Sequence, residues 1–316
     1  MSIIEKAVDK LEKMTAISKK YSGKEQDVDG SDIQPVEDFK AEQNTPQEEQ
    51  IEVDPAVADR SDAKSAPKAK AKAKDKDKDK DKDKEAKTIE LPLARIESLG
   101  MVSPNQPKSK IAEEYRVVKR PLLMNIRGEG ASEVENANLI LVSSAVSGEG
   151  KTFSAVNLAL SIAMEQDTTV LFVDADVSKA TATRFLGIAD NQQGLVDVLQ
   201  NSDIAVSDVL LHTNIPNLRI LPAGRAHDRT TELLASDNMR RVMLELSRRY
   251  SDRVIVFDSP PLLQTTEASV LANLVGQVVL VVAANETPQA AVTEAIQHIR
   301  EDKVIGTLLN KSRKKD

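Results

Sequence analysis

The stretch ILVSSAVSGEGKT, residues 140–152, decides the fold, because an apolar strand runs directly into a glycine-rich turn that ends in Lys151 and Thr152. The backbone N–H groups of such a turn can surround a polyphosphate, a lysine neutralises its β and γ oxygens, and a hydroxyl holds Mg²⁺. The usual pattern, GxxxxGK(S/T), has its first glycine where this chain has Ala145, so the loop is a deviant form. The predicted nucleotide-binding residues of this loop are Gly148, Glu149, Gly150, Lys151, Thr152 and Phe153.

The composition is uneven along the 316 residues and predicts one folded domain behind a long tail. Residues 21–88 are first acidic and then consist largely of Ala-Lys and Asp-Lys repeats, which bury too little apolar surface to offset the entropy of ordering. We therefore predict a disordered linker over 21–88 and a folded domain over 89–316. Residues 1–20 have the pattern of an amphipathic helix, either solvated or docked on a partner or a membrane surface.

Several classes of protein are disfavoured by what the sequence lacks. It has no cysteine, its N-terminus has no apolar signal-peptide core, and its longest apolar run, Val278–Ala284, is far shorter than the roughly 20 residues of a membrane-spanning helix. Aromatic residues make up 3% with no tryptophan, and His212, His227 and His298 share no metal-ligand spacing. We expect a cytoplasmic protein without a zinc site or a nucleic-acid partner.

From residue 89 onward, apolar strands alternate with helical patterns. The predicted strands are 139–144, 169–175, 218–222, 253–258, 277–283 and 304–309. The predicted helices are 151–165, 231–250, 266–274 and 287–301. Nearly continuous Val, Ile and Leu runs are typical of parallel strands covered on both faces, so we expect a doubly wound, mostly parallel α/β sheet flanked by helices.

Carboxylates follow two of these strands, at Asp174, Asp176 and Asp258. A single aspartate after a strand usually caps a helix or forms a turn, but two such segments behind a GKT loop favour a catalytic site at the carboxyl edge of the sheet. We expect Thr152, Asp176 and Asp258 to surround Mg²⁺ and Asp174 to accept a proton, although Asp174 and Asp176 could exchange these roles. Lys151 would stabilise the charge on the transferred phosphoryl group.

Together these segments resemble the bacterial tyrosine kinases, a family of deviant P-loop ATPases. Residues 147–152 match that family's PGEGK(S/T) with Ser147 in place of proline, Asp174 and Asp176 match its DxD motif, and Asp258 matches its Walker B aspartate. Ser178 stands where many members carry arginine. The resemblance implies an ATP-dependent protein-tyrosine autokinase that requires Mg²⁺.

Partition ATPases of the Min/Par type share this fold and carry a signature lysine five residues before the Walker lysine. This chain has Val146 at that position, which favours the kinase. A regulatory or scaffolding ATP-binding module, which switches assembly with a membrane partner and transfers little phosphate, is the alternative function.

Glu113, Arg116 and Lys119 are spaced to share one helical face. A solvated charged face has the same spacing, but the segment is similar to the ExxRxx(R/K) motif through which bacterial tyrosine kinases contact neighbouring subunits. The resemblance therefore implies a homo-oligomer, with these three residues as contacts.

The opening residues and the TELLAS segment at 231–236 look like those of exosortase-linked tyrosine autokinases from exopolysaccharide loci. This subgroup resembles the cytoplasmic half of a polysaccharide co-polymerase. The resemblance implies regulation of exopolysaccharide biosynthesis or export, a membrane-embedded co-polymerase partner, and a location at the inner face of the plasma membrane.

The chain departs from the family at the phosphate acceptor, because it lacks a C-terminal tyrosine cluster. Its only tyrosines are Tyr21, Tyr115 and Tyr250, and Tyr21, in the predicted linker, is the expected acceptor. Asn310, after the last strand, is predicted either to read the adenine base or to form a simple turn.

Overall fold

The computed structural model describes residues 87–130, 133–189, 191–225, 227, 229–250 and 252–312. All of these residues lie in one compact unit, Lys76–Asp316. The predicted N-terminal helix, the linker up to residue 86 and Tyr21 lie outside the described residues. No helix within the described ranges is long and apolar enough to cross a bilayer.

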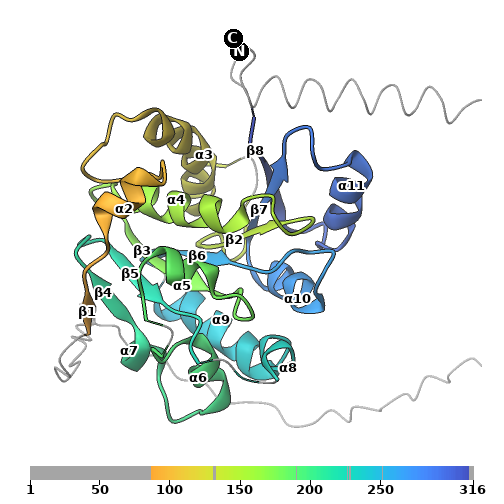
Figure 1. Ribbon diagram of the computed structural model, residues 1–316. Helices are drawn as coiled ribbons and strands as arrows, with labels where there is room; N and C mark the ends of the chain where they lie inside the picture. The colour runs from red at the N-terminus through yellow and green to blue at the C-terminus, as the bar shows by residue number, and fades with distance from the viewer. Residues whose placement is uncertain are drawn as a thin grey trace, which may run out of the picture. The chain divides into compact units, whose positions relative to one another are not determined.

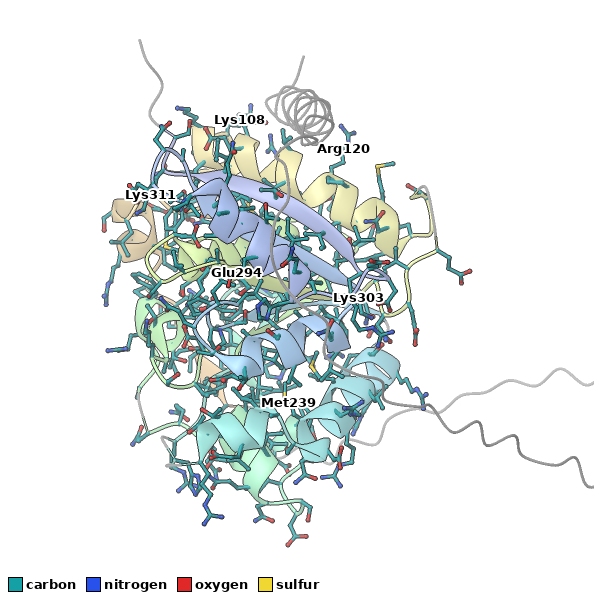
Figure 2. The ribbon with its side chains drawn as sticks, turned by 90° about the vertical axis from the view of Figure 1, so that its right-hand side faces the viewer. Lys108, Arg120, Met239, Glu294, Lys303 and Lys311 are labelled. Carbon is teal, nitrogen blue, oxygen red and sulfur yellow. The ribbon has the colours of Figure 1, made fainter. Side chains whose placement is uncertain are left out.

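Eight strands form one sheet in the order β1-β4-β5-β3-β6-β2-β7-β8. The strands are β1 (Thr88–Ile89), β2 (Leu139–Ser144), β3 (Thr169–Asp174), β4 (Leu211–Thr213), β5 (Leu218–Leu221), β6 (Arg253–Asp258), β7 (Gln277–Ala283) and β8 (Val304–Asn310). All neighbours are parallel except β4 and β5, which are antiparallel. Lys303 and Lys311 flank β8, the strand at one end of the sheet (Figure 2).

Helices cover both faces of the sheet (Figure 1). They are α2 (Leu93–Ser98), α3 (Lys110–Ile126), α4 (Lys151–Ala163), α5 (Thr181–Phe185), α6 (Leu195–Gln200), α7 (Val206–Val209), α8 (Thr230–Leu234), α9 (Asp237–Arg249), α10 (Thr266–Leu274) and α11 (Gln289–Gln297). The helices α3 and α4 pack on one face and α9, α10 and α11 on the other. Two separate hydrophobic cores result, one on each side of the sheet.

Alternation of side chains along the strands builds these two cores. Leu139 and Leu141 of β2 enter the core beneath α9 and α10, whereas Ile140 and Val142 enter the core beneath α3 and α4. Both sets are apolar because each face is covered, which is why the run looks continuous in the sequence. The predicted doubly wound, mostly parallel sheet is confirmed.

The six predicted strands are all present, within one residue at each end. The predicted helix 231–250 is instead divided into α8 and α9, because the Ser236 side chain accepts a hydrogen bond from the backbone N–H of Met239 and starts a new helix. The predicted helix 287–301 is shorter, and β1, β4 and the helices α2, α5, α6 and α7 were not predicted. These elements have two to six residues, too few to produce a periodic pattern.

Candidate active site

Three adjacent strands bring the predicted site residues to one edge of the sheet. The strands β3, β6 and β2 are neighbours, Asp174 lies opposite Asp258 in the register of β3 and β6, and Asp258 lies opposite Val142 of β2. The glycine-rich loop follows β2 directly. The loop and the carboxylates that sequence patterns placed on separate segments therefore meet at the carboxyl ends of parallel strands, where ligands of such sheets bind.

The loop has the backbone conformation that its glycines permit. Gly148 and Gly150 have φ values of 90° and 95°, in the left-handed region that side chains disfavour. Gly150 caps α4, so Lys151 and Thr152 occupy the first turn of that helix. The unpaired N–H groups and the positive dipole end of the helix therefore face the position expected for phosphate.

Side chains of the loop and of the last strand hold this conformation. The Glu149 carboxylate accepts hydrogen bonds from the N–H of Val146 (2.7 Å) and from the Thr287 hydroxyl, and Asn310 Nδ2 donates to the Glu149 carbonyl (2.8 Å). A Cβ on Gly150 would lie 2.0 Å from Asn310 Nδ2. The carboxylate of Glu149 and the amide nitrogen of Asn310 thus position the loop, while adenine contact by Asn310 stays a prediction. Phe153 packs its ring against the core.

Lys151 and Asp176 form a buried ion pair, with 2.5 Å between Nζ and Oδ2. Lys151 Nζ also lies 3.4 Å from the Thr152 hydroxyl oxygen. The amine is thus already held beneath the loop at the place where a phosphate would approach it. Incoming phosphate oxygens would compete with Asp176 for this charge.

Only one of the two carboxylate oxygens of Asp174 is hydrogen-bonded. Its Oδ2 accepts hydrogen bonds from the N–H (2.9 Å) and the hydroxyl (2.7 Å) of Thr183, while Oδ1 is buried without a hydrogen-bond partner in the described structure. Burial raises the pKa of Asp174 to about 6, with a further upward contribution from Asp176, although the Thr183 hydrogen bonds oppose the shift. Such a carboxylate is ionised at neutral pH and is a stronger base than an exposed one.

Asp258 is fully buried, and neither of its oxygens has a hydrogen-bond partner among the described residues. Burial raises the pKa of Asp258 well above its usual range. The charge of Lys151 and the nearby Thr152 hydroxyl lower this pKa, and the charges of Asp174 and Asp176 raise it. Buried carboxylates without partners are costly, and they occur where a ligand satisfies them.

The local charge balance fits a divalent cation. Three carboxylates, Asp174, Asp176 and Asp258, share one ammonium group, that of Lys151. Among the described residues no group of three or more His, Cys, Asp or Glu forms a cage that could hold a metal ion. Magnesium does not require one, since it commonly binds through one or two carboxylates together with substrate phosphates and water.

The predicted contact helix, α3, divides its charged residues between two environments. Glu113 and Arg116 are exposed and form an ion pair with each other, and Arg116 also donates to the Pro107 carbonyl (2.8 Å). Lys119 is buried, and its Nζ lies 2.6 Å from Glu165 Oε1 and 2.5 Å from the Ser161 carbonyl oxygen. The prediction that Lys119 shares the exposed face is corrected, because this side chain turns inward to the end of α4.

Two of the three tyrosines are buried in the fold. Tyr115 on α3 is 5% exposed and Tyr250 at the end of α9 is 7% exposed. Burial raises the pKa of Tyr115 to about 12 and also raises the pKa of Tyr250. Both side chains are packed in a hydrophobic core, so neither hydroxyl is positioned to accept a phosphoryl group.

Sequence reasoning missed two side chains of the site. Thr183 holds Asp174, and Lys179 donates from Nζ to the hydroxyl of Ser147 in the phosphate loop (2.9 Å). Both lie in the segment after β3, whose return toward the loop depends on tertiary packing. A signal for Lys179 was its basic charge beside Ser178, where the related motif has arginine.

Comparison with known proteins identifies the family. Residues 137–311 match the family model of an AAA domain. The chain is 30% identical over 209 residues to the putative tyrosine-protein kinase CapB of Staphylococcus aureus, covering 66% of this chain and 87% of CapB. It is 29% identical over 213 residues to the tyrosine-protein kinase YwqD of Bacillus subtilis, covering 66% of this chain and 85% of YwqD. The solved kinase domain of VpsO superposes with a TM-score of 0.56 at 29% identity, covering 67% of this chain and 100% of that domain.

Proposed function

Because the chain belongs to the family of bacterial tyrosine-protein kinases and carries an AAA domain, we propose that it transfers the γ-phosphoryl group of ATP to tyrosine, including tyrosine of its own chain. The observation that carries this proposal is the buried Lys151–Asp176 pair beneath the Gly148–Gly150 loop, beside Asp174 and Asp258, which retain unpaired oxygens. Val146, at the position of the partition-type signature lysine, also supports a kinase rather than a partition ATPase.

In the proposed site the backbone from Gly148 to Phe153 binds the phosphates of ATP. Lys151 stabilises the charge of the transferred phosphoryl group, and Thr152, Asp176 and Asp258 hold Mg²⁺. When bound, Mg²⁺ supplies positive charge that neutralises the phosphate oxygens. The open oxygens of Asp258 and the excess of carboxylates over ammonium groups support this assignment.

Asp174 acts as the base in the proposed reaction. A bond forms between the tyrosine phenol oxygen and the γ-phosphorus, the bond from that phosphorus to the β,γ-bridging oxygen breaks, and ADP leaves. The phenol proton passes to Asp174, whose pKa of about 6 suits proton transfer near neutral pH. The exchange of roles between Asp174 and Asp176 is less favoured, because Asp176 is already paired with Lys151.

We propose Tyr21 as the site of self-phosphorylation. The burial of Tyr115 and Tyr250 supports this assignment by elimination, since the chain has no other tyrosine. Phosphate located by mass spectrometry at Tyr115 or Tyr250 after incubation with Mg-ATP would contradict it.

The proposed setting is exopolysaccharide biosynthesis or export at the inner face of the plasma membrane. A membrane-embedded co-polymerase would recruit the kinase there, and copies of the kinase would associate through the exposed Glu113 and Arg116 of α3. The support for this setting is the resemblance of residues 231–236 to kinases from exopolysaccharide loci and the exposure of the Glu113–Arg116 pair.

A regulatory ATP-binding module is the second candidate function. It would use nucleotide occupancy to control assembly with a membrane partner and would transfer little phosphate. The burial of two of the three tyrosines favours this alternative, because it leaves the chain with a single candidate acceptor.

Phosphotyrosine formation separates the two functions. We expect the purified full chain to acquire phosphotyrosine with Mg-ATP, Lys151→Met to abolish it, and the matched variant Lys108→Met, at an exposed lysine outside the site (Figure 2), to behave as wild type. Nucleotide binding without any phosphotyrosine in the wild type would support the regulatory module. Phosphorylation by Lys151→Met at the wild-type rate would refute the assigned site.

A further inference from the structure

A recess of about 270 Å³ opens beside the proposed site, between the segment after β3 and the segment after β5. These strands are parallel neighbours, so the recess lies at the same edge of the sheet as the catalytic carboxylates. Its lining includes Ser178, Lys179, Thr183, Arg184, Gln192 and Gly224.

Two lining residues connect the recess to the proposed chemistry. The Thr183 hydroxyl donates to Asp174 Oδ2 (2.7 Å), and Lys179 Nζ donates to the hydroxyl of Ser147 in the phosphate loop (2.9 Å). The recess is therefore separated from the proposed base by the Thr183 side chain and from the phosphate loop by the Lys179 side chain. A tyrosine segment bound there would hold its hydroxyl close to the reacting groups, as transfer requires.

The recess is smaller than the roughly 300–1,000 Å³ of pockets that enclose drug-sized ligands. A single side chain with part of its flanking backbone is of suitable size, which favours a peptide.

The charge of the lining residues indicates the charge of the peptide that the recess would bind. Lys179 and Arg184 contribute two cations, and no carboxylate lies among the described lining residues. Arg225, which follows Gly224, is already paired with the buried Asp197 (2.6 Å). Arg184 is exposed, and one of its terminal nitrogens donates to the Lys179 carbonyl. Its remaining N–H groups are available to a carboxylate, for which a planar guanidinium is well suited.

The chain's own candidate acceptor does not match this charge. Tyr21 follows Lys19 and Lys20 and precedes Lys24, whereas the acidic part of the linker, Glu25–Asp62, contains no tyrosine. Like charges placed together oppose binding. A tyrosine with acidic neighbours would bind the recess better than the sequence around Tyr21.

We propose that this recess binds the acceptor peptide and selects a tyrosine flanked by acidic residues, so that the preferred substrate is a tyrosine segment of another protein. The inference rests on the proposed phosphotransfer function and adds the class of substrate to it. Arg184 and Lys179 determine specificity, whereas Lys151 and Asp174 serve the reaction itself.

Initial rates of the full-chain protein with three synthetic peptides test the proposal. Each peptide has one tyrosine, flanked on both sides by glutamate, glutamine or lysine. We expect the lowest KM for the glutamate peptide and the highest for the lysine peptide. In Arg184→Glu the KM of the glutamate peptide should rise about ten-fold and that of the lysine peptide should fall, while the KM of the glutamine peptide and all kcat values change little.

The outcomes are distinguishable from failure of the proposed function. Wild-type protein that phosphorylates none of the peptides overturns both proposals, and Lys151→Met provides the inactive reference. Equal KM values for the three peptides, or an Arg184→Glu effect that is the same for all three, leave the kinase intact and overturn the recess as a charge-selective site. Arg184→Gln gives the same comparison with a smaller expected shift if Arg184→Glu does not fold.

Discussion

At the scale of single residues, the site contains charges that the protein alone does not satisfy. Asp258 is buried with both oxygens unpaired, and Asp174 is buried with one. In each case burial raises the pKa, so the ionised form is destabilised in the folded protein. Stability has been exchanged for a site that is complete only with its ligands.

Asp258→Asn should stabilise the protein in the absence of ligands at pH 7, because burial opposes the ionised form of this carboxyl, which the unfolded chain adopts freely. We expect thermal unfolding to shift upward by about 2–4 °C, the shift that roughly 1 kcal/mol produces in a domain of this size. The raised pKa means that the folded state takes up the proton first as the pH falls, so the advantage of the variant should shrink in acid. Asp203→Asn, at an exposed aspartate, is the matched control. A lower midpoint for Asp258→Asn at pH 7 would contradict the predicted cost of this charge.

The pH profile of kinase activity should depend on Asp174. Its pKa of about 6 predicts that kcat/KM falls as the pH drops through this value, since the protonated carboxyl cannot accept the phenol proton. Thr183→Val removes a hydrogen bond to the ionised form, so the acid limb should move to higher pH. Asp174→Asn should lower kcat by about 100-fold or more and abolish this limb. A profile that is unchanged in both variants would exclude Asp174 as the base.

The sequence predicted where these residues lie in the sheet but not their environments. Asp174 and Asp258 end apolar strands and Lys151 follows one, so their position at the sheet edge follows from chain order and strand periodicity. The inward direction of Lys119 and the contact of Thr183 with Asp174 depend on how α3 and α5 pack, which local spacing does not encode. The division of residues 231–250 into two helices depends on one serine side chain, a residue type that favours N-caps but is also tolerated within helices.

At the scale of elements, α3 is tied to α4, the helix that starts at the phosphate loop. Lys119 on α3 binds Glu165 and the Ser161 carbonyl at the far end of α4. The exposed Glu113–Arg116 pair lies on the same helix. The helix α3 therefore carries both the predicted subunit contact and the Lys119 contacts that hold the end of α4.

Lys119→Met should lower the free energy of unfolding by about 1–2 kcal/mol, because it leaves the Ser161 carbonyl without this donor and Glu165 without its partner. Urea unfolding measures this change. The control Arg116→Met, at an exposed position of α3, should leave stability nearly unchanged and weaken self-association in sedimentation experiments. The assigned roles would be reversed if Lys119→Met dissociated the protein at unchanged stability.

At the scale of the whole molecule, the sheet gathers the site from segments far apart in the chain. The phosphate loop follows β2, yet its Glu149 makes two hydrogen bonds to distant parts of the chain. The Glu149 carboxylate accepts from the backbone N–H of Ala283, 134 residues away, and the Glu149 carbonyl accepts from Asn310, 161 residues away. Family membership and sheet architecture were predictable from the sequence because strand patterns and motifs are local. These long-range hydrogen bonds were not predictable, since they depend on β7 lying next to β2 and on β8 lying beyond β7.

The hydrogen bond from Asn310 to the phosphate loop has a consequence for the nascent chain on the ribosome. Ribosomes add roughly 5–20 residues per second, and contacts of large sequence separation form only after both partners have emerged. The phosphate loop is translated near the middle of the chain, but its hydrogen bond with Asn310 can form only after β8 has been synthesised. The ability to bind nucleotide should therefore appear late in synthesis. A chain stalled on the ribosome before Asn310 contains the complete GKT motif, but its phosphate loop lacks the hydrogen bond from Asn310.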